Sequence, residues 1–237
     1  MIFSKTEVWG FEHAIRGARN PMNSWDKSDS GIGCKEYGEN KLCEECSIYD
    51  CGWGEFIIGP NDMVLLQRLI KAGPEHRKFM RQIMVSVDIT APMYFWSEFD
   101  TYKVGTVANS TSKMHKLAST PITIDCFEID DFEEITFGVG EIQSPNMIIN
   151  YCEKLRQKYL ETKDKKYWKE LIRWLPESWL QTRTVTMNYE NLLAMCSKGQ
   201  RRFHKLTEWR DSFIGWARQL PYAQELIFID ELEDKTE

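Results

Sequence analysis

The sequence lacks any apolar run close to the roughly 20 residues that a membrane-spanning helix needs. Its first residues, Met1-Ile2-Phe3-Ser4-Lys5, also lack the basic and apolar regions of a secretory signal peptide. Internal repeats and low-complexity segments are absent too. Because 42% of the residues are hydrophobic and 28% are charged, the chain can bury a core and keep a polar surface. We therefore expect a compact cytoplasmic protein without a membrane partner.

Positive charge is in short supply. Lys and Arg number 30 against 36 Asp and Glu, which gives a formal net charge of −6. Nonspecific affinity for nucleic acid depends on a surplus of Lys and Arg, so this balance argues against extended nucleic acid as a partner. One segment, residues 198–205, is locally basic. Such a run forms either a solvated face or a phosphate-facing surface, and the sequence leaves both open.

Histidine is scarce as well. Only four His residues occur, and no two of them show the spacing of a metal site. No Ser or Cys lies in the sequence setting of a catalytic nucleophile. Conventional hydrolase chemistry therefore has no support, and the sequence assigns no catalytic residue.

Seven Cys residues in a chain without a secretory signal indicate thiols or metal rather than disulfides. Cys43 and Cys46 form a C-x-x-C turn that can place two sulfurs on one zinc ion, and Cys34 and Cys51 flank it. We expect a Cys-rich insertion at about residues 31–54; a zinc ion bound there would be structural, because four thiolates leave no open position for water. The alternative is four unpaired thiols in a surface loop. The other three Cys residues are expected in the core.

Apolar periodicity predicts a mixture of helices and strands. Residues 82–90 alternate apolar and polar side chains, as in a strand with one buried face, and Ala91-Pro92 then favours a helix start. Further expected elements are a strand at 3–9, a loop at 20–59, and helices at 11–16, 62–72, 147–161, 188–194 and 207–216. The aromatic residues Tyr94, Phe95, Trp96 and Phe99 are expected in the core or at a subunit contact rather than stacked on a base.

The segment after the 82–90 strand carries a motif. It follows the spacing R-H-R-x-x-S-x-N-x-x-S-x-R, with Thr101-Tyr102-Lys103 at the triplet and Thr106, Thr111 and Lys113 at the two Ser and the last Arg. Downstream, Leu175-Pro176 and residues 186–193 match L-P and T-V-N-A-R-S-L-L at the same internal distance. In these blocks the chain resembles the flavin-dependent thymidylate synthases. Weaker matches are Ala18-Arg19 to A-A-R and residues 207–210 to W-E-I-R.

The resemblance implies a single domain over residues 1–237. Its class would be α/β (α+β), with a central, mostly antiparallel sheet flanked by helices. The family also implies a homo-oligomer, most simply a homotetramer, with sites at subunit interfaces. The nine Trp and twelve Phe residues agree with this, because aromatic side chains are favoured at such interfaces.

The departures from the motif cluster on one ligand. In the family, two residues of the triplet, a His on the preceding strand and the Arg of N-A-R face the flavin, and the resemblance places Thr101, Tyr102, Gln82 and Glu190 there. An Arg-to-Glu change at position 190 swings the local charge by two units beside an anionic pyrophosphate. We therefore expect no flavin cofactor, with FAD as the alternative.

The substrate side is altered too. Glu98 replaces a Gln that reads the pyrimidine, and an ionised Glu only accepts hydrogen bonds, so it favours a base that presents donors. Gly199 replaces an Arg, although Arg201 and Arg202 follow and could substitute. Hydroxyl and cation positions are kept, so an anionic nucleotide could still be held. The predicted ligand-binding residues are Glu98, Tyr102, Lys103, Thr106, Thr111, Lys113, Asn188, Arg201, Arg202 and Arg210.

Two functions follow from this resemblance. The first is a nucleotide-binding protein that has lost flavin chemistry and holds or sequesters a nucleotide; such divergent chains are associated with phages and prophages, which would place it in the host cytoplasm. The second is an FAD-dependent thymidylate synthase that methylates dUMP or a related pyrimidine nucleotide. The first is favoured because the chemistry of the family belongs to the flavin, whose expected contacts are missing.

Overall fold

The computed structural model describes residues 1–33, 55–129, 135–136, 142–143 and 145–233. The chain divides into two compact units. Unit 1 comprises Met1–Ser4, Asp88–Lys103 and Ala108–Val185, and unit 2 comprises Lys5–Val87, Val104–Val107 and Thr186–Glu237. The single domain expected over residues 1–237, with its insertion at about 31–54, stays a prediction. No helix among the described residues is long and apolar enough to cross a lipid bilayer.

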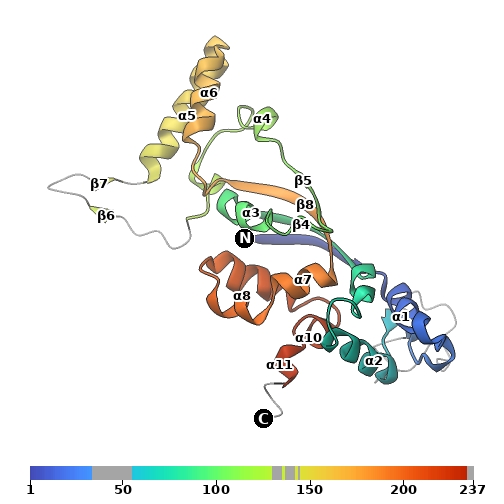
Figure 1. The fold of residues 1–237 in the computed structure, drawn as a ribbon. Helices are drawn as coiled ribbons and strands as arrows, with labels where there is room; N and C mark the ends of the chain where they lie inside the picture. Colours follow the sequence, from blue (N-terminus) through green and yellow to red (C-terminus); the bar gives the residue numbers. More distant parts are fainter. Residues whose placement is uncertain (34–54, 130–134, 137–141, 144, 234–237) are drawn as a thin grey trace. The chain divides into compact units, whose positions relative to one another are not determined.

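A four-stranded sheet has the order β1-β4-β8-β5 (Figure 1). Its strands are β1 (Ile2–Trp9), β4 (Met84–Pro92), β8 (Leu180–Asn188) and β5 (Val107–Ser110), and each contributes residues to both units. In β4 the side chains of Val85, Val87 and Ile89 are buried and those between them only partly so, which confirms the predicted alternation. The mixed class with an antiparallel sheet flanked by helices is confirmed.

Helix α3 (Met93–Phe99) in unit 1 directly follows β4. Pro92 is the last residue of β4 and the N-cap of this helix, with an extended ψ of 157°. The helix therefore begins at Met93, one residue after the Ala91-Pro92 pair at which it was expected to start. Phe95, Trp96 and Phe99 are at most 2% exposed and pack with ring centroids 5.4–6.0 Å apart. The prediction that the rings belong to the core is confirmed for these three, whereas Tyr94 is only partly buried.

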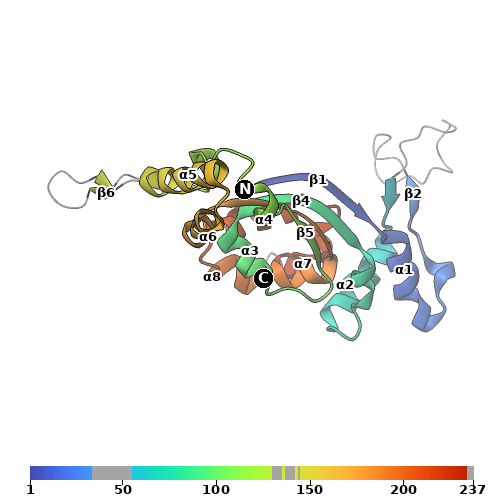
Figure 2. The same cartoon turned by 90° about the horizontal axis from the view of Figure 1, so that it is seen from above.

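A helical hairpin forms the second part of unit 1. Helix α5 (Pro145–Thr162) covers the predicted helix at 147–161, and α6 (Lys165–Trp174) ends before Leu175-Pro176. The two helices pack side by side (Figures 1 and 2). Asp164 caps α6 by accepting a hydrogen bond from the Lys166 N–H at 2.9 Å. Unit 1 also contains α4 (Lys113–Lys116), the 3-10 helix η6 (Ile124–Cys126), and the paired strands β6 (Ile135–Thr136) and β7 (Ile142–Gln143).

The core of this part of unit 1 is apolar. It consists of buried side chains from α5, α6 and the preceding loop: Leu117, Ile122, Phe127, Ile149, Cys152, Leu155 and Leu171.

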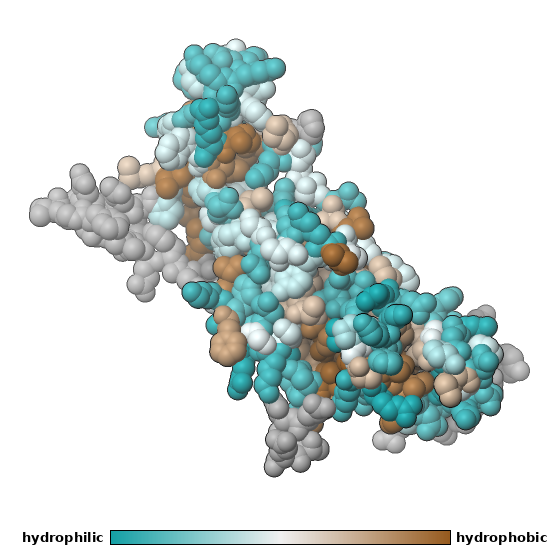
Figure 3. Space-filling view, viewed as in Figure 1, coloured by the Kyte–Doolittle hydropathy of each residue, from teal (hydrophilic) through white to brown (hydrophobic). Residues whose placement is uncertain are grey.

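The surface of the hairpin is polar at one end and carries apolar side chains toward the other (Figure 3). Met147, Ile148 and Trp174 are 62%, 50% and 57% exposed.

Unit 2 begins with α1 (Phe11–Arg19), the 3-10 helices η1 (Asn20–Met22) and η2 (Trp25–Lys27), and a hairpin of β2 (Gly31–Gly33) and β3 (Glu55–Ile57). The sequence predicted a loop over residues 20–59, and this is wrong for the two strands. Three-residue strands leave too short a pattern to detect by periodicity. Helix α2 (Pro60–Lys71) confirms the helix predicted at 62–72, and η5 (Lys78–Gln82) precedes β4.

A buried ion pair joins α1 to α2. Arg19 Nε donates to Asp62 Oδ1 at 2.6 Å, and the hydroxyls of Ser28 and Ser30 both donate to Asp62 Oδ2 at 2.6 Å. Arg19 also donates to the carbonyls of Ser24 and Lys27. One carboxylate therefore fixes the loop at 24–30 to both helices. The Arg of the early A-A-R match has this structural role.

The second half of unit 2 is helical. It contains α7 (Tyr189–Met195), α8 (Lys198–Phe203), the π-helix η7 (Glu208–Phe213), α9 (Ile214–Ala217), α10 (Ala223–Leu226) and α11 (Asp230–Glu233). Trp209 and Phe213 are fully buried, and the Trp209 indole N–H donates to the Met195 carbonyl at 3.1 Å. The helices predicted at 188–194 and 207–216 are present, with a π-helical turn in the second.

Candidate functional site

Five of the predicted ligand-binding residues lie in unit 1. Glu98 is in the last turn of α3, Tyr102 and Lys103 follow this helix, Thr111 follows β5, and Lys113 begins α4. Lys103 and Thr111 are exposed, whereas the other three are partly buried. The backbone N–H of Thr111 donates to the Thr182 carbonyl at 2.9 Å, which ties this residue to β8.

The triplet positions in unit 1 follow a well-anchored helix. The indole N–H of Trp96 lies 3.1 Å from the Ala91 carbonyl and 3.0 Å from the Gln181 carbonyl. Arg183 places its guanidinium 4.3 Å from the Trp96 ring centroid and 2.9 Å from Asp100 Oδ1. Arg183 therefore orients the end of α3. No sequence motif indicated this role, because the residue lies within a strand and its partner is distant in the sequence.

The other five predicted residues lie in unit 2: Thr106, Asn188, Arg201, Arg202 and Arg210. Asn188 is the N-cap of α7, and its side chain accepts from the Asn191 N–H at 2.9 Å. The Asn191 side chain in turn accepts from the Asn188 backbone N–H at 3.1 Å, and it donates to the Val104 carbonyl at 2.7 Å. A Cβ on Gly105, whose φ is 81°, would lie 3.1 Å from the Asn188 amide. The structure thus brings the loop around Thr106 to the start of α7.

The three predicted cations of unit 2 differ in their surroundings. Arg201 is 11% exposed and forms ion pairs with Asp230 at 2.5 Å and Glu231 at 3.0 Å. Both carboxylates lie in α11, so these ion pairs attach α11 to α8. Arg210 is exposed and pairs with Asp211 at 2.9 Å. Arg202 is exposed on α8. Of these three, Arg202 and Arg210 are the better placed to meet a ligand, because Arg201 would first have to release two carboxylates.

Glu190, the sharpest departure from the family motif, is not an isolated negative charge. Its Oε1 accepts a hydrogen bond from Arg77 Nε at 3.2 Å, and its Oε2 accepts one from Arg81 Nε. Burial of the Glu190 carboxyl opposes ionisation, but the hydrogen bonds from Arg81 and Arg77 outweigh it and lower its pKa. Two guanidiniums thus surround one carboxylate, and the cluster has a surplus of positive charge. The sequence argument had considered position 190 alone.

The zinc ligands predicted at Cys34, Cys43, Cys46 and Cys51 lie outside the described residues. Within the described part of the chain, no group of three or more His, Cys, Asp or Glu side chains is placed to hold a metal ion. Cys152 and Cys196 are fully buried, as expected of core residues, and Cys126 is partly buried. Burial raises the pKa of the Cys196 thiol to about 12, so this thiol stays protonated at neutral pH.

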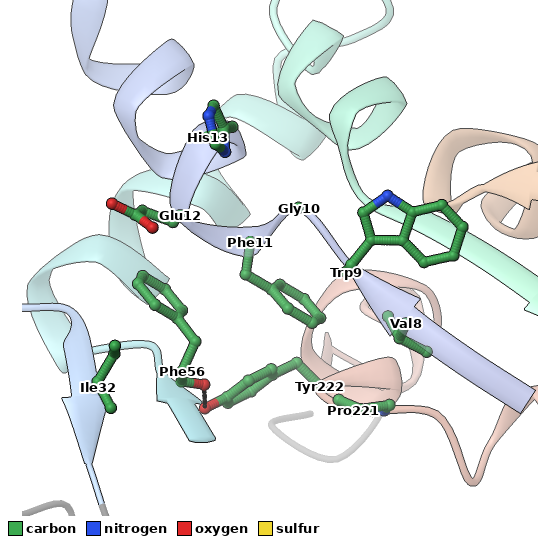
Figure 4. A pocket seen from close by; sticks show the side chains of 10 residues that line it. All are labelled: Val8, Trp9, Gly10, Phe11, Glu12, His13, Ile32, Phe56, Pro221 and Tyr222. Atoms are coloured by element: carbon green, nitrogen blue, oxygen red, sulfur yellow. Dashed lines mark hydrogen bonds between the residues drawn. The ribbon is translucent and has the colours of Figure 1, made fainter. Parts of the chain in front are cut away.

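A pocket of about 530 Å³ opens at the start of α1 in unit 2. In Figure 4 the rings of Phe11, Phe56 and Tyr222 gather around it, and Glu12 and His13 lie on the helix. The Tyr222 hydroxyl accepts from the Ile58 N–H at 3.0 Å and donates to the Phe56 carbonyl at 3.5 Å. None of the predicted ligand-binding residues lines this pocket.

Comparison with solved structures identifies the fold. A flavin-dependent thymidylate synthase, ThyX, from Helicobacter pylori, complexed with FAD and dUMP, is similar with a TM-score of 0.62 and 15% identity, over 97% of this chain and 99% of that one. A second structure of this enzyme with FAD and dUMP has a TM-score of 0.64 and 15% identity, over 97% of this chain and 98% of that one. A third similar structure is the UMP/dUMP methylase PolB from Streptomyces cacaoi, bound with 5-Br dUMP. Its TM-score is 0.53 and its identity 10%, over 96% of this chain and 95% of that one. No protein-family model and no curated protein matches the chain.

These comparisons establish a ThyX-like fold and correct the cofactor prediction. We expected no cofactor, yet both Helicobacter pylori structures with this fold are complexes with FAD. The physical argument against a flavin rested on missing contacts at Thr101, Tyr102 and Gln82 and on the negative charge of Glu190. Arg77 and Arg81 compensate that charge, so the part of the argument that concerns Glu190 fails.

Proposed function

We propose that this protein binds an anionic pyrimidine nucleotide of the uridylate type. The observation that carries the proposal is the fold, which extends over 97% of the chain and is similar to that of an enzyme complexed with dUMP. Because the structural similarity extends over nearly the whole chain, a ligand of the same kind is the simplest proposal. We place this activity in the cytoplasm, in that of the host if the chain is encoded by a phage.

The phosphate contacts are proposed for cations near the motif positions. Lys103 and Lys113 in unit 1 and Arg210 in unit 2 lie at those positions, and Arg202 in unit 2 follows one of them by three residues. Thr106 and Thr111 would add hydroxyl contacts, and Asn188 would act from the start of α7. A charge-assisted hydrogen bond contributes roughly 1.5–3 kcal/mol, so the loss of one cation is expected to be measurable.

The base contact is proposed for Glu98 with Tyr102 beside it. An ionised carboxylate accepts hydrogen bonds and cannot donate them. Glu98 can therefore accept from the N3–H of uracil or from the amino group of cytosine, but it cannot donate to the uracil carbonyls. We expect dCMP to compete with dUMP more strongly than it would at a site that carries a Gln.

The cluster of Arg77, Arg81 and Glu190 has a surplus of positive charge. This charge suits the anionic pyrophosphate of a flavin dinucleotide. Bound there, a flavin would supply the redox chemistry of a reductive methylation. The chain's own residues would bind and orient the two ligands. The second candidate function is to hold or sequester the nucleotide without turnover, and Thr101 and Tyr102 at the Arg and His positions of the triplet favour it.

We also propose a homo-oligomer, most simply a tetramer, with ligand sites at subunit boundaries. Exposed apolar side chains support the proposal, since Trp174 and Phe203 are 57% and 77% exposed. Light scattering at micromolar concentration should give a multiple of 27.9 kDa. A mass equal to that of one chain would contradict the proposal.

The function is tested by calorimetry with dUMP, dCMP and neutral uridine, followed by a turnover assay in the presence of FAD, a hydride donor that reduces the flavin, and a one-carbon donor. Binding of the monophosphates that is at least tenfold tighter than that of uridine supports a nucleotide site. Methylated product then favours the synthase, and binding without product favours sequestration. No binding of either monophosphate would overturn the proposed function.

A further inference from the structure

The charge cluster of Arg77, Arg81 and Glu190 lies wholly within unit 2 and has more positive than negative charge. Arg77 comes directly before η5, Arg81 lies in it, and Glu190 is in the first turn of α7. Two guanidiniums share one carboxylate, so the cluster keeps a net charge of about +1 when all three groups are ionised. Glu75 acts on Arg81 as well, but more weakly than Glu190 does.

The donors of this cluster are only partly used. Each guanidinium contacts Glu190 through its Nε, and among the described residues neither Arg77 nor Arg81 makes a further hydrogen bond. The forked Nη1 and Nη2 side of a guanidinium is the side that binds phosphate in a bidentate manner. Arg77 is 25% exposed and Arg81 is 55% exposed, so solvent reaches these groups.

The backbone around the cluster is fixed. The Ile83 carbonyl accepts a hydrogen bond from the Tyr189 N–H at 3.0 Å, which joins the end of η5 to the start of α7. Gly10 approaches the same segment so closely that a Cβ on it would lie 2.1 Å from the Gln82 carbonyl oxygen. Arg81 and Glu190 are each next to a residue tied in this way. The cluster therefore does not depend on the ion pairs alone for its position.

Glu190 has a defined role in this arrangement. Two guanidiniums held side by side repel one another, and the carboxylate between them offsets that repulsion when no ligand is present. It also contacts both side chains through their Nε atoms, so the Nη1 and Nη2 donors remain available for a second acceptor. A phosphate that binds the forks adds a second anion to the pair of cations.

We propose that Arg77 and Arg81 form a phosphate-binding site in which Glu190 is the internal counterion. The resemblance to the synthases puts a cation at position 190 of α7, and in this chain the positive charge is supplied from η5 and the residue before it instead. The inference rests on the proposed nucleotide-binding function and deepens it. The ligand chemistry is a phosphate ester, whether the phosphate of the pyrimidine nucleotide or the pyrophosphate of a flavin dinucleotide.

The test compares Arg77→Gln, Arg81→Gln and Glu190→Gln with the full-length protein. The matched control is Arg68→Gln, which removes an exposed guanidinium from α2 in the same unit. Binding of dUMP and of FAD is measured by calorimetry, with uridine and riboflavin as phosphate-free probes. Circular dichroism and thermal unfolding establish that each variant is folded, and Arg77→Lys and Arg81→Lys replace any Gln variant that is not.

Each Arg→Gln variant is expected to weaken binding of at least one phosphate-bearing ligand about tenfold, equivalent to about 1.4 kcal/mol. Uridine and riboflavin binding and the Arg68→Gln control should change less than about twofold. Loss with dUMP alone assigns the site to the nucleotide, and loss with FAD alone assigns it to the flavin. Glu190→Gln should bind phosphate at least as tightly as the parent protein, with a steeper salt dependence.

The inference is overturned if the parent protein binds dUMP or FAD and both Arg variants retain its affinity. A tenfold loss in Glu190→Gln would contradict the counterion role. If the parent protein binds neither ligand, the proposed function fails instead, so the two failures can be told apart.

Discussion

Removing the Asp62 charge should destabilise unit 2 strongly. In the folded protein Asp62 is fully buried and Arg19 is 6% exposed, and the pair is 2.6 Å apart. The substitution Asp62→Asn keeps the shape but leaves the Arg19 charge buried without its counterion. Removing one partner of a buried ion pair costs roughly 3–5 kcal/mol. For a chain of this size each kcal/mol corresponds to about 2–4 °C, so the midpoint of thermal unfolding should fall by roughly 6–20 °C.

The assay is unfolding by urea, followed by circular dichroism, with Asp26→Asn as the control. Asp26 is exposed, so its substitution should change the free energy of unfolding by less than about 0.5 kcal/mol. Burial alone would raise the pKa of Asp62. The hydrogen bonds from Ser28, Ser30 and Arg19 have the larger, opposite effect, so the pKa of Asp62 in the folded protein is below its ordinary value of 3.8. Its contribution is therefore present above pH 3.8 and is lost as the pH falls through the folded-state pKa. An Asp62→Asn variant as stable at neutral pH as Asp26→Asn would refute the reasoning.

Two further predictions concern unit 1. Lys103→Ala should weaken dUMP binding at least tenfold, because it removes a charge-assisted contact of roughly 1.5–3 kcal/mol; unchanged affinity in calorimetry would exclude Lys103 from the site. Glu153 has a pKa lowered to about 2, chiefly by the Arg156 hydrogen bond and despite partial burial. Its stabilising effect is fully present above about pH 4.5 and declines as the pH falls toward 2. Glu153→Gln should lower the free energy of unfolding by about 1–3 kcal/mol at pH 7 and by less at pH 3, and an equal loss at both pH values in urea titrations would contradict this.

Long elements with strong periodicity were predictable from the sequence. The alternation in β4 and the helical spacing in α5 each extend over several turns or pleats, so one face of each element is marked repeatedly. The β2–β3 hairpin was missed because its strands have three residues each. The two motif blocks indicated the fold, since spacing within a block survives when side chains change.

Pairs of distant residues were not predictable in the same way. Arg77 and Glu190 are 113 positions apart, and nothing near either residue announces the other. The same holds for Arg183 and Asp100, which are 83 positions apart. Charge at a site is the sum over such neighbours, so a substitution read at one position missed the two guanidiniums beside Glu190. The ten predicted ligand-binding residues themselves stay a prediction.

The central claim is that this chain binds an anionic pyrimidine nucleotide, and calorimetric titration of the full-length protein with dUMP and uridine tests it most directly. We predict saturable binding of dUMP and at least tenfold weaker binding of uridine, because the phosphate supplies the charge that the cations recognise. The difference should shrink as salt is raised, since screening weakens contacts between exposed charges. Equal affinity for dUMP and uridine, or no binding of dUMP, would contradict the account.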